Sequence, residues 1–243
     1  MGIKMRRRLP VILAAVVCIA GLGVLLYPTI SNWYNLWMQS RLISEYERKV
    51  EELDTEAFTE IYEAARIYNE KLYQLGLSFA DIDADDERLR VNGQGYAQLL
   101  DINGNGVMGY VSIEKIDVRL AISHGTDEGV LHDGVGHLEG SSLPVGGENT
   151  HSALFGHRGL PSALLFTDLD QMETGDSFQV NILGRTLDYQ VDQILVIEPQ
   201  ETEPLEIVEG KDYVTLVTCT PYAVNTHRLL IRGVRVEGTG DME

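Results

Sequence analysis

The segment Tyr213-Val-Thr-Leu-Val-Thr-Cys219-Thr-Pro-Tyr222 carries the strongest structural signal in this sequence. Valine, leucine and threonine dominate it, which is typical of a β-strand. Pro221 cannot continue a central strand, so the strand is expected to end just after Cys219. A short polar turn then leads into a second β-rich run, Leu229–Val236. The two runs predict a hairpin that places Arg228, at the end of its strand, close to Cys219.

Charge excludes one broad class of partner. The 243 residues include 19 basic and 37 acidic side chains, which gives a formal net charge of -18. Binding to nucleic acid depends on clustered lysine and arginine side chains that neutralise phosphates, so we expect no nucleic-acid partner. Most of the acidic residues follow residue 44, and such an excess of charge is typical of a soluble portion.

The two cysteines, Cys18 and Cys219, do not form a disulfide framework. Cys18 lies inside an apolar run and is expected to behave as a small hydrophobic residue. Cys219 is therefore predicted to be a free thiol, either a buried inert one or a reactive one. Its neighbours in the fold decide between these two interpretations.

His157 and Arg228 are the candidate partners of that thiol. His157 follows an apolar strand that ends at Gly156, so it lies, like Cys219, where a strand gives way to a loop. A thiolate nucleophile needs a nearby base or cation, and an imidazole can pass the proton to a leaving amine. A guanidinium stays charged and donates several hydrogen bonds to a developing oxyanion. The three residue types predict acyl transfer through a thioester.

No metal site is expected from the sequence. His124, His132 and His137 lie in a glycine-rich stretch, but their spacing matches no metal-binding signature. The segment Asp101–Gly106 starts like a calcium-binding loop, yet Ser112 stands where the bidentate acid belongs. The acidic stretch 81–87 lacks the glycine of such a loop and is expected to be a solvated loop.

The N-terminus predicts a membrane anchor. Basic residues between Lys4 and Arg8 precede Leu9–Tyr27, a run of nineteen positions without a charge. That length spans a bilayer core, and the positive cluster predicts a cytoplasmic N-terminus. A cleaved signal peptide is the alternative, but the run is long and has no convincing cleavage site. We expect a retained single-pass anchor in the cell membrane, with an extracellular catalytic domain and an aromatic belt at the interface formed by Trp33, Tyr34 and Trp37.

Residue patterns divide the rest of the chain. Apolar residues at spacings of three and four predict helices up to about residue 75, and short strands with glycine turns follow. Such strands suggest a closed or partly closed β-barrel. The expected parts are a basic N-terminus (1–8), the transmembrane anchor (9–27), a helical stalk (28–75), an acidic loop (76–103), the catalytic barrel (104–238) and a short tail (239–243).

Several motifs resemble those of a known family. Thr215-Leu-Val-Thr-Cys219 followed by Arg228 resembles the Thr-Leu-x-Thr-Cys…Arg signature of the sortases. The class C, pilin-polymerising sortases are more similar still, through Gly-Val-Gly-His137-Leu-Glu-Gly, Ser-Leu-Pro-Val-Gly-Gly147, Gly-His157-Arg-Gly-Leu-Pro-Ser-Ala and Leu-Phe-Thr-Asp168-Leu-Asp. The match runs from about Gly104 to Val236. It implies a mainly β fold, a sortase-type eight-stranded β-barrel with N-terminal helices and a transmembrane helix.

The resemblance also implies an activity. In that family a thiolate, here Cys219, attacks the Thr–Gly bond of a Leu-Pro-x-Thr-Gly-like sorting signal in a pilin or surface protein. His157 would be the acid and base, Arg228 would stabilise the oxyanion or the substrate, and a lysine amine of the next pilin subunit would resolve the acyl-enzyme. This chemistry needs no metal or organic cofactor. The expected substrate contacts beside the nucleophile are Thr218, Thr220 and Tyr222.

Two features depart from the class C pattern. Members carry a lid with an Asp-Pro-aromatic motif upstream of the barrel, and no such tripeptide is present here. Phe79 and Asp81 are the candidates for a degenerate lid. Many members also have a C-terminal membrane helix, whereas this sequence ends at Glu243 and is expected to use the N-terminal anchor.

Three alternatives to pilin assembly stay open at the level of sequence. A sortase that attaches surface proteins to peptidoglycan would use the amine of a peptidoglycan precursor as the acceptor. A papain-like cysteine protease would use water, although the local signature around a papain-type cysteine is missing. A membrane-anchored adhesive or scaffolding domain would need neither the imidazole nor the guanidinium.

Overall fold

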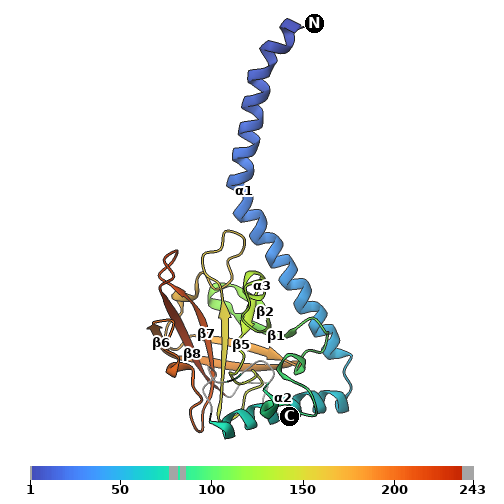
Figure 1. Cartoon of the computed structure of the whole chain (residues 1–243), viewed down its shortest axis with the longest axis vertical. Coiled ribbons are helices and arrows are strands. Elements are labelled where there is room, and N and C mark those ends of the chain that lie inside the picture. The colour runs from blue at the N-terminus through green and yellow to red at the C-terminus, as the bar shows by residue number, and fades with distance from the viewer. Residues whose placement is uncertain (1, 77–81, 83–85, 237–243) are drawn as a thin grey trace.

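Two α-helices precede the barrel in the computed structural model, which describes residues 2–76, 82 and 86–236 (Figure 1). The first helix, α1, runs from Gly2 to Glu51, and the second, α2, from Thr55 to Leu75. The side chain of Asp54 caps α2 by accepting a hydrogen bond from the Ala57 amide at 2.8 Å, and Gly76 ends it at φ 58°. The candidate lid residues Phe79 and Asp81 lie outside the described residues.

Eight strands form a closed barrel in the order β1-β2-β3-β4-β7-β8-β6-β5. This confirms the expected mainly β, eight-stranded fold. Closure pairs β1 with β5, so none of these described strands leaves an open edge. The strands are β1 (Val107–Ile113), β2 (Val118–His124), β3 (Val135–His137), β4 (Thr150–Gly156), β5 (Ser177–Ile182), β6 (Arg185–Ile197), β7 (Asp212–Thr220) and β8 (His227–Arg235), and the short helix α3 (Glu128–Asp133) precedes β3.

Alternating apolar side chains fill the barrel. Burial removes apolar surface from water and is the main force that holds the strands in register. Phe178 and Tyr189 stack with their ring centroids 5.6 Å apart. Gly233 lies directly beneath them, where a Cβ atom would come within 2.6 Å of the Phe178 ring. A glycine is therefore required at this position of β8.

Helix α2 covers one end of the barrel with a buried face (Figure 1). Asn69 on that face forms two hydrogen bonds with Leu143 in the loop before β4. Its side-chain nitrogen donates to the Leu143 carbonyl at 2.9 Å, and its side-chain oxygen accepts from the Leu143 amide at 2.7 Å. The pair satisfies two buried backbone groups of a loop that belongs to no sheet. The helix and the loop are thereby fixed to each other.

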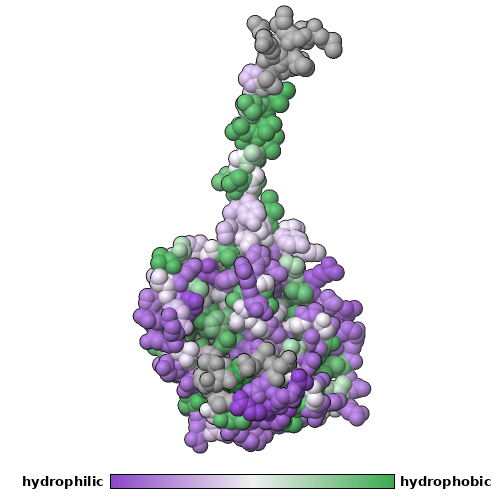
Figure 2. All heavy atoms as spheres, in the orientation of Figure 1, coloured by the Kyte–Doolittle hydropathy of each residue, from purple (hydrophilic) through white to green (hydrophobic). Residues whose placement is uncertain are grey.

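The second half of α1 packs along the side of the barrel. Tyr46 donates to the Met108 carbonyl at 2.8 Å and accepts from the Leu183 amide at 2.8 Å, and its burial raises its pKa. Residues 12–30 of this helix extend beyond the barrel, and most of their side chains are apolar and exposed, as the green part of the helix in Figure 2 shows. Among the described residues, this helix alone is long and apolar enough to cross a membrane.

Candidate active site

Strands β4 and β7 bring His157 to the strand end that carries Cys219. The two strands are parallel neighbours whose register pairs Leu154 with Leu216 and Phe155 with Val217. Continued by two residues, this register sets His157 beside Cys219. The hydroxyl of Thr218 donates to the Gly156 carbonyl at 2.8 Å and ties the two strand ends together.

The hairpin of β7 and β8 places Arg228 directly opposite Cys219. The two residues are Cα partners in the antiparallel ladder, as are Val217 and Leu230 two positions further along. Residues in opposite positions share a face of the sheet, with Cβ atoms about 4.5–5.5 Å apart. The guanidinium donates to the His227 carbonyl at 3.1 Å and to the Asn225 carbonyl at 3.4 Å.

All three predicted residues lie on one face of the barrel. Side chains alternate along a strand, so residues two apart point the same way. Phe155, Val217 and Leu230 pack in one apolar cluster, and each is two positions from His157, Cys219 and Arg228, respectively. The thiol, the imidazole and the guanidinium therefore continue the face on which this cluster lies, and all three are half-buried.

A pocket of about 100 Å³ adjoins Arg228 on the same face. Its walls are apolar apart from the guanidinium and two side chains of the β6–β7 loop, Glu201 and Thr202. The other lining residues are Leu138, Phe155, Ile197, Pro199, Leu205, Val217 and Leu230. A small apolar pocket with one cationic end suits an extended peptide that offers an apolar side chain next to a carbonyl.

The environment of His157 favours its neutral form. Burial lowers the pKa of the imidazole, and the charge of His132 lowers it further, whereas Glu128 acts in the opposite direction. Both of these neighbours belong to α3. A neutral imidazole at physiological pH is able to take a proton from a thiol.

The loop after His157 is held against the β7–β8 loop. Arg158 forms an ion pair with Asp170 and lies over the ring of Tyr222, with 5.7 Å between the guanidinium carbon and the ring centroid. Gly159 has a φ of +75°, and a Cβ atom there would come within 3.0 Å of the same ring. These contacts connect the loop that carries the imidazole to the loop that follows the thiol.

The expected substrate contacts differ in accessibility. Thr218 is only 2% exposed, and its hydroxyl donates a hydrogen bond to the Gly156 carbonyl. The side chain therefore holds the ends of β4 and β7 together and does not face an open cleft. Thr220 is half-buried and Tyr222 is exposed. The bond between Thr220 and Pro221 is cis.

Sequence reasoning missed the role of His151 and Thr215. The Nδ1 atom of His151 donates to the Glu206 carbonyl at 2.8 Å, and its Nε2 atom accepts from the Thr215 hydroxyl at 2.7 Å. Glu206 belongs to the β6–β7 loop, which forms a wall of the apolar pocket. His151 thus anchors that wall to the barrel. A histidine and a threonine on separate strands gave no local signal of this contact.

We expect His151 to make the stability of the fold sensitive to acid. Burial lowers its pKa from 6.5 to about 4, so below pH 6.5 the unfolded chain takes up a proton that the folded chain does not. Its contribution to the free energy of unfolding, about 3 kcal/mol, is complete above pH 6.5 and is lost as the pH falls toward 4. Urea unfolding of His151→Asn, which retains a donor for Glu206, should show a flatter pH profile in this window. An unchanged pH profile in His151→Asn would assign the acid sensitivity to another group.

The remaining histidines near the site have structural partners. His137 is fully buried, its Nδ1 accepts from the Tyr96 hydroxyl at 2.8 Å, and burial lowers its pKa to about 3. Both ring nitrogens of His124 face backbone carbonyls, those of Gly106 and Leu99. Within the described ranges, no cluster of histidine, cysteine and acidic side chains is arranged to hold a metal ion.

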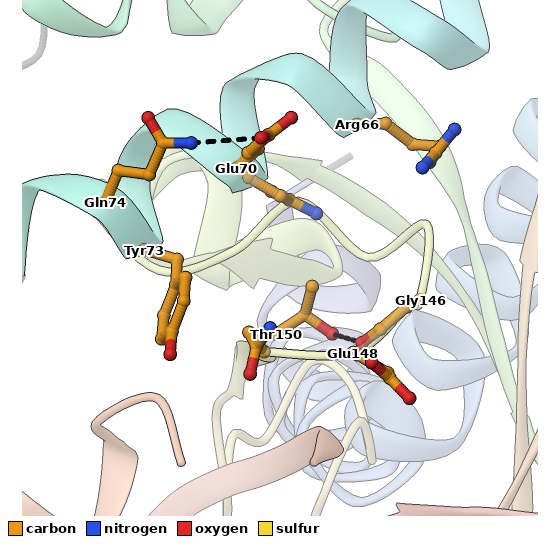
Figure 3. A pocket seen from close by; sticks show the side chains of 10 residues that line it. Arg66, Glu70, Tyr73, Gln74, Gly146, Glu148 and Thr150 are labelled. Atoms are coloured by element: carbon orange, nitrogen blue, oxygen red, sulfur yellow. Dashed lines mark hydrogen bonds between the residues drawn. The ribbon is translucent and has the colours of Figure 1, made fainter. Parts of the chain in front are cut away.

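A second pocket, of about 540 Å³, lies at the other end of β4 (Figure 3). Five residues of α2 form one wall and Gly146–Thr150 the other, and most of the side chains are polar. Thr150 and Gly156 are six residues apart on β4, which corresponds to about 20 Å along a strand. This pocket is therefore separate from the face that carries the thiol.

The fold and the site define a closed β-barrel with a thiol, an imidazole and a guanidinium at one rim. Comparison with known proteins identifies this arrangement. The family model described as "Sortase domain" matches residues 111–236. The chain belongs to the sortase family.

Solved structures refine the classification. Sortase C1 from Streptococcus agalactiae is 47% identical, with 82% of this chain and 99% of that chain aligned at a TM-score of 0.76. Sortase C from Streptococcus pneumoniae is 39% identical over 83% and 100% of the two chains, with a TM-score of 0.69. Sortase C from Clostridium perfringens is 39% identical over 82% and 99%, with a TM-score of 0.66. The resemblance to class C sortases is confirmed.

The curated relatives are more distant. Sortase A of Streptococcus agalactiae serotype III is 28% identical over 140 residues, 56% of this chain and 55% of that protein. Sortase A of Bacillus anthracis is 26% identical over 127 residues, 52% and 59% of the two proteins. The match thus spans little more than half the length of these relatives.

Proposed function

We propose that this chain is a cysteine transpeptidase that polymerises pilins. The direct opposition of Cys219 and Arg228 in the β7–β8 ladder, with His157 beside them, is the observation that carries this proposal. Solved relatives support it: the Streptococcus pneumoniae enzyme is described in terms of pilin substrate specificity, and a Clostridium perfringens sortase C has been solved with a C-terminal cell wall sorting motif.

Acylation would proceed in balanced proton steps. His157 takes the proton of the Cys219 thiol, and the sulfur attacks the threonine carbonyl of the Leu-Pro-x-Thr-Gly-like signal. Arg228 donates hydrogen bonds to the oxyanion that forms. The imidazolium then gives its proton to the glycine nitrogen, the C–N bond breaks and a thioester remains.

Deacylation would reverse these roles. A lysine amine of the next pilin loses a proton to His157 and attacks the thioester carbonyl, and the sulfur leaves and recovers the proton. The apolar pocket beside Arg228 would hold an apolar side chain of the signal and align its carbonyl with the thiol. Thr220 and Tyr222 would line the entrance to the active site. Thr218 would hold the end of β4, and with it His157, in place through its hydrogen bond to the Gly156 carbonyl.

We also propose that α1 anchors the protein in the cell membrane. The apolar half of the helix would span the bilayer once, with the basic N-terminus in the cytoplasm and the barrel outside. The substrate proteins would then meet the barrel on the outer surface of the cell.

The experiment that tests the function is intact-protein mass spectrometry with a Leu-Pro-x-Thr-Gly-like peptide. We expect an adduct with the mass of the acyl fragment, which a lysine-containing pilin peptide converts into an amide. A peptide acid as the sole product would favour a protease, and discharge by a peptidoglycan-precursor amine alone would favour cell-wall anchoring. An absence of any adduct would contradict acyl transfer.

Arg228→Lys is expected to lower kcat/KM by about 10²–10³-fold, because one ammonium does not reproduce the planar fork of donors at the oxyanion. Peptide turnover measured by chromatography checks this value. Arg232→Lys is the matched control, since that guanidinium is paired with Asp192 at 2.8 Å and its register partner on β7 is Thr215. Activity of Arg228→Lys within a few-fold of the parent would argue against an oxyanion role.

A further inference from the structure

The docked half of α1 fixes the direction in which the barrel faces the membrane. Asn32 accepts a hydrogen bond from the Leu164 amide at 2.9 Å, and Asn35 and Gln39 both donate to the Asp133 carbonyl, at 2.9 and 2.7 Å. These three side chains follow one another along a single face of the helix. The helix is therefore fastened to the barrel from Asn32 onward.

One end of the barrel is attached to α1 close to the apolar run, and this is the end that carries the candidate active site. Leu164 lies in the segment that follows β4 and His157, and the β7–β8 loop leaves the same end because β4 and β7 are parallel. In Figure 1 both segments project toward the free half of α1. The opposite end of the barrel, where β4 and β7 begin, faces away.

Distances along the helix place this end at the depth of lipid headgroups. Asn32 is five residues beyond Tyr27, the last position of the apolar run, which is about 8 Å at the helical rise. The headgroup layer on each side of a bilayer is about 5–8 Å thick. A tilt of the helix would only bring the barrel closer to the bilayer.

Composition at this end suits contact with lipid. Residues 159–167 and 220–226 contain no charged side chain, in a chain with 19 basic and 37 acidic ones. Leu164 is 51% exposed, Tyr222 55% and Val224 63%. Figure 2 shows apolar surface at this rim, beside the helix. The exposed rings of Trp33 and Trp37 on α1 lie at the same level of the helix as Asn32 and Asn35.

We infer that the exposed side chains of segments 159–167 and 220–226, chiefly Leu164, Tyr222 and Val224, form a membrane-contact surface whose partner is the phospholipid bilayer that holds α1. Leu164 and Val224 enter the headgroup layer, and the site opens at the bilayer surface. The contact is apolar, because the segments are uncharged and an acidic barrel gains nothing from anionic lipid. This inference rests on the proposed anchoring by α1 and is independent of the proposed chemistry.

Fluorescence quenching by brominated lipid tests the contact. The full chain with Trp33→Phe and Trp37→Phe is reconstituted in phosphatidylcholine vesicles with Val224→Trp, or with Val208→Trp as the matched control. Val208 is 44% exposed and precedes β7 at the opposite end of the barrel. Lipid brominated near the headgroup should remove about half of the emission at position 224, where the indole would lie in the interface, and almost none at position 208. Equal quenching at the two positions, or none at 224, overturns the inference.

A second measurement separates this inference from the enzymatic proposal. Val224→Asp and Leu164→Asp should leave acylation by a soluble sorting peptide unchanged and slow the turnover of a substrate anchored in the same vesicle. Equal losses on the soluble and the anchored substrate would show that the segments act on catalysis and would overturn the lipid contact. If the parent forms no adduct with either substrate, the proposed chemistry fails, and the quenching result still decides the contact.

Discussion

Cys219→Ala is expected to abolish both thioester formation and the covalent joining of pilins. The sulfur is the atom that the acyl group would occupy, and no other described side chain at this rim offers a comparable nucleophile. Removal of the nucleophile in acyl-transfer enzymes costs about six orders of magnitude in kcat, which is below detection in most assays. Mass spectrometry of the enzyme and a gel ladder of pilin polymers are the two measurements.

The chain provides its own control for this variant. Cys18 is the other thiol, and it lies exposed on the apolar half of α1, far from the rim. Cys18→Ala should therefore leave both measurements unchanged. Polymers that persist in Cys219→Ala but disappear in Cys18→Ala would show that the nucleophile has been assigned to the wrong cysteine.

The local parts of the site could be predicted from sequence because they belong to one hairpin. The run from Tyr213 has strand residues, Pro221 ends it, and the return strand follows within a few residues. These facts alone bring Arg228 near Cys219, and the structure shows the two as direct partners. Short-range pairing needs no knowledge of the rest of the fold.

The position of His157 depends on contacts that sequence periodicity does not encode. Strands β4 and β7 are parallel and about sixty residues apart, so their register follows from closure of the whole barrel. The sequence pattern predicts only that His157 and Cys219 each follow the end of a strand, and the resemblance of the motifs is what indicates that the two strand ends meet. The anchoring of the β6–β7 loop by His151 is equally non-local, and no motif marked it.

One prediction about substrate contact could have been improved from sequence alone. Its place beside the nucleophile predicts that Thr218 contacts substrate together with Thr220 and Tyr222. Adjacent residues of a strand point to opposite faces, so Thr218 could not share the face of Cys219. The structure buries it and gives its hydroxyl to Gly156. The alternation of side chains along a strand therefore predicts a supporting role for Thr218.

His157→Gln is expected to lower kcat/KM by about 10²–10⁴-fold, because no other group would take the thiol proton and return it to the leaving amine. The parent should also show an acid limb in its pH profile. Burial lowers the pKa of His157, so the imidazole is neutral at physiological pH. The acid limb should therefore lie below the ordinary histidine pKa of 6.5. The variant should lose this limb. Initial rates with a sorting peptide between pH 4 and 8 provide both results, and an unchanged limb in His157→Gln would assign it to another group.

Two neighbours on α3 allow the acid limb to be assigned to His157, because they shift the pKa of His157 in opposite directions. The carboxylate of Glu128 raises the pKa of His157, so Glu128→Gln should move the acid limb to lower pH. The charge of His132 lowers it, so His132→Gln should move the limb to higher pH. Neither side chain lines the pocket beside Arg228, so the maximal rate should change little in both variants. Opposite displacements at a constant maximal rate are expected only if His157 itself carries the catalytic proton, because a general loss of packing around α3 would lower the rate without moving the limb in two directions.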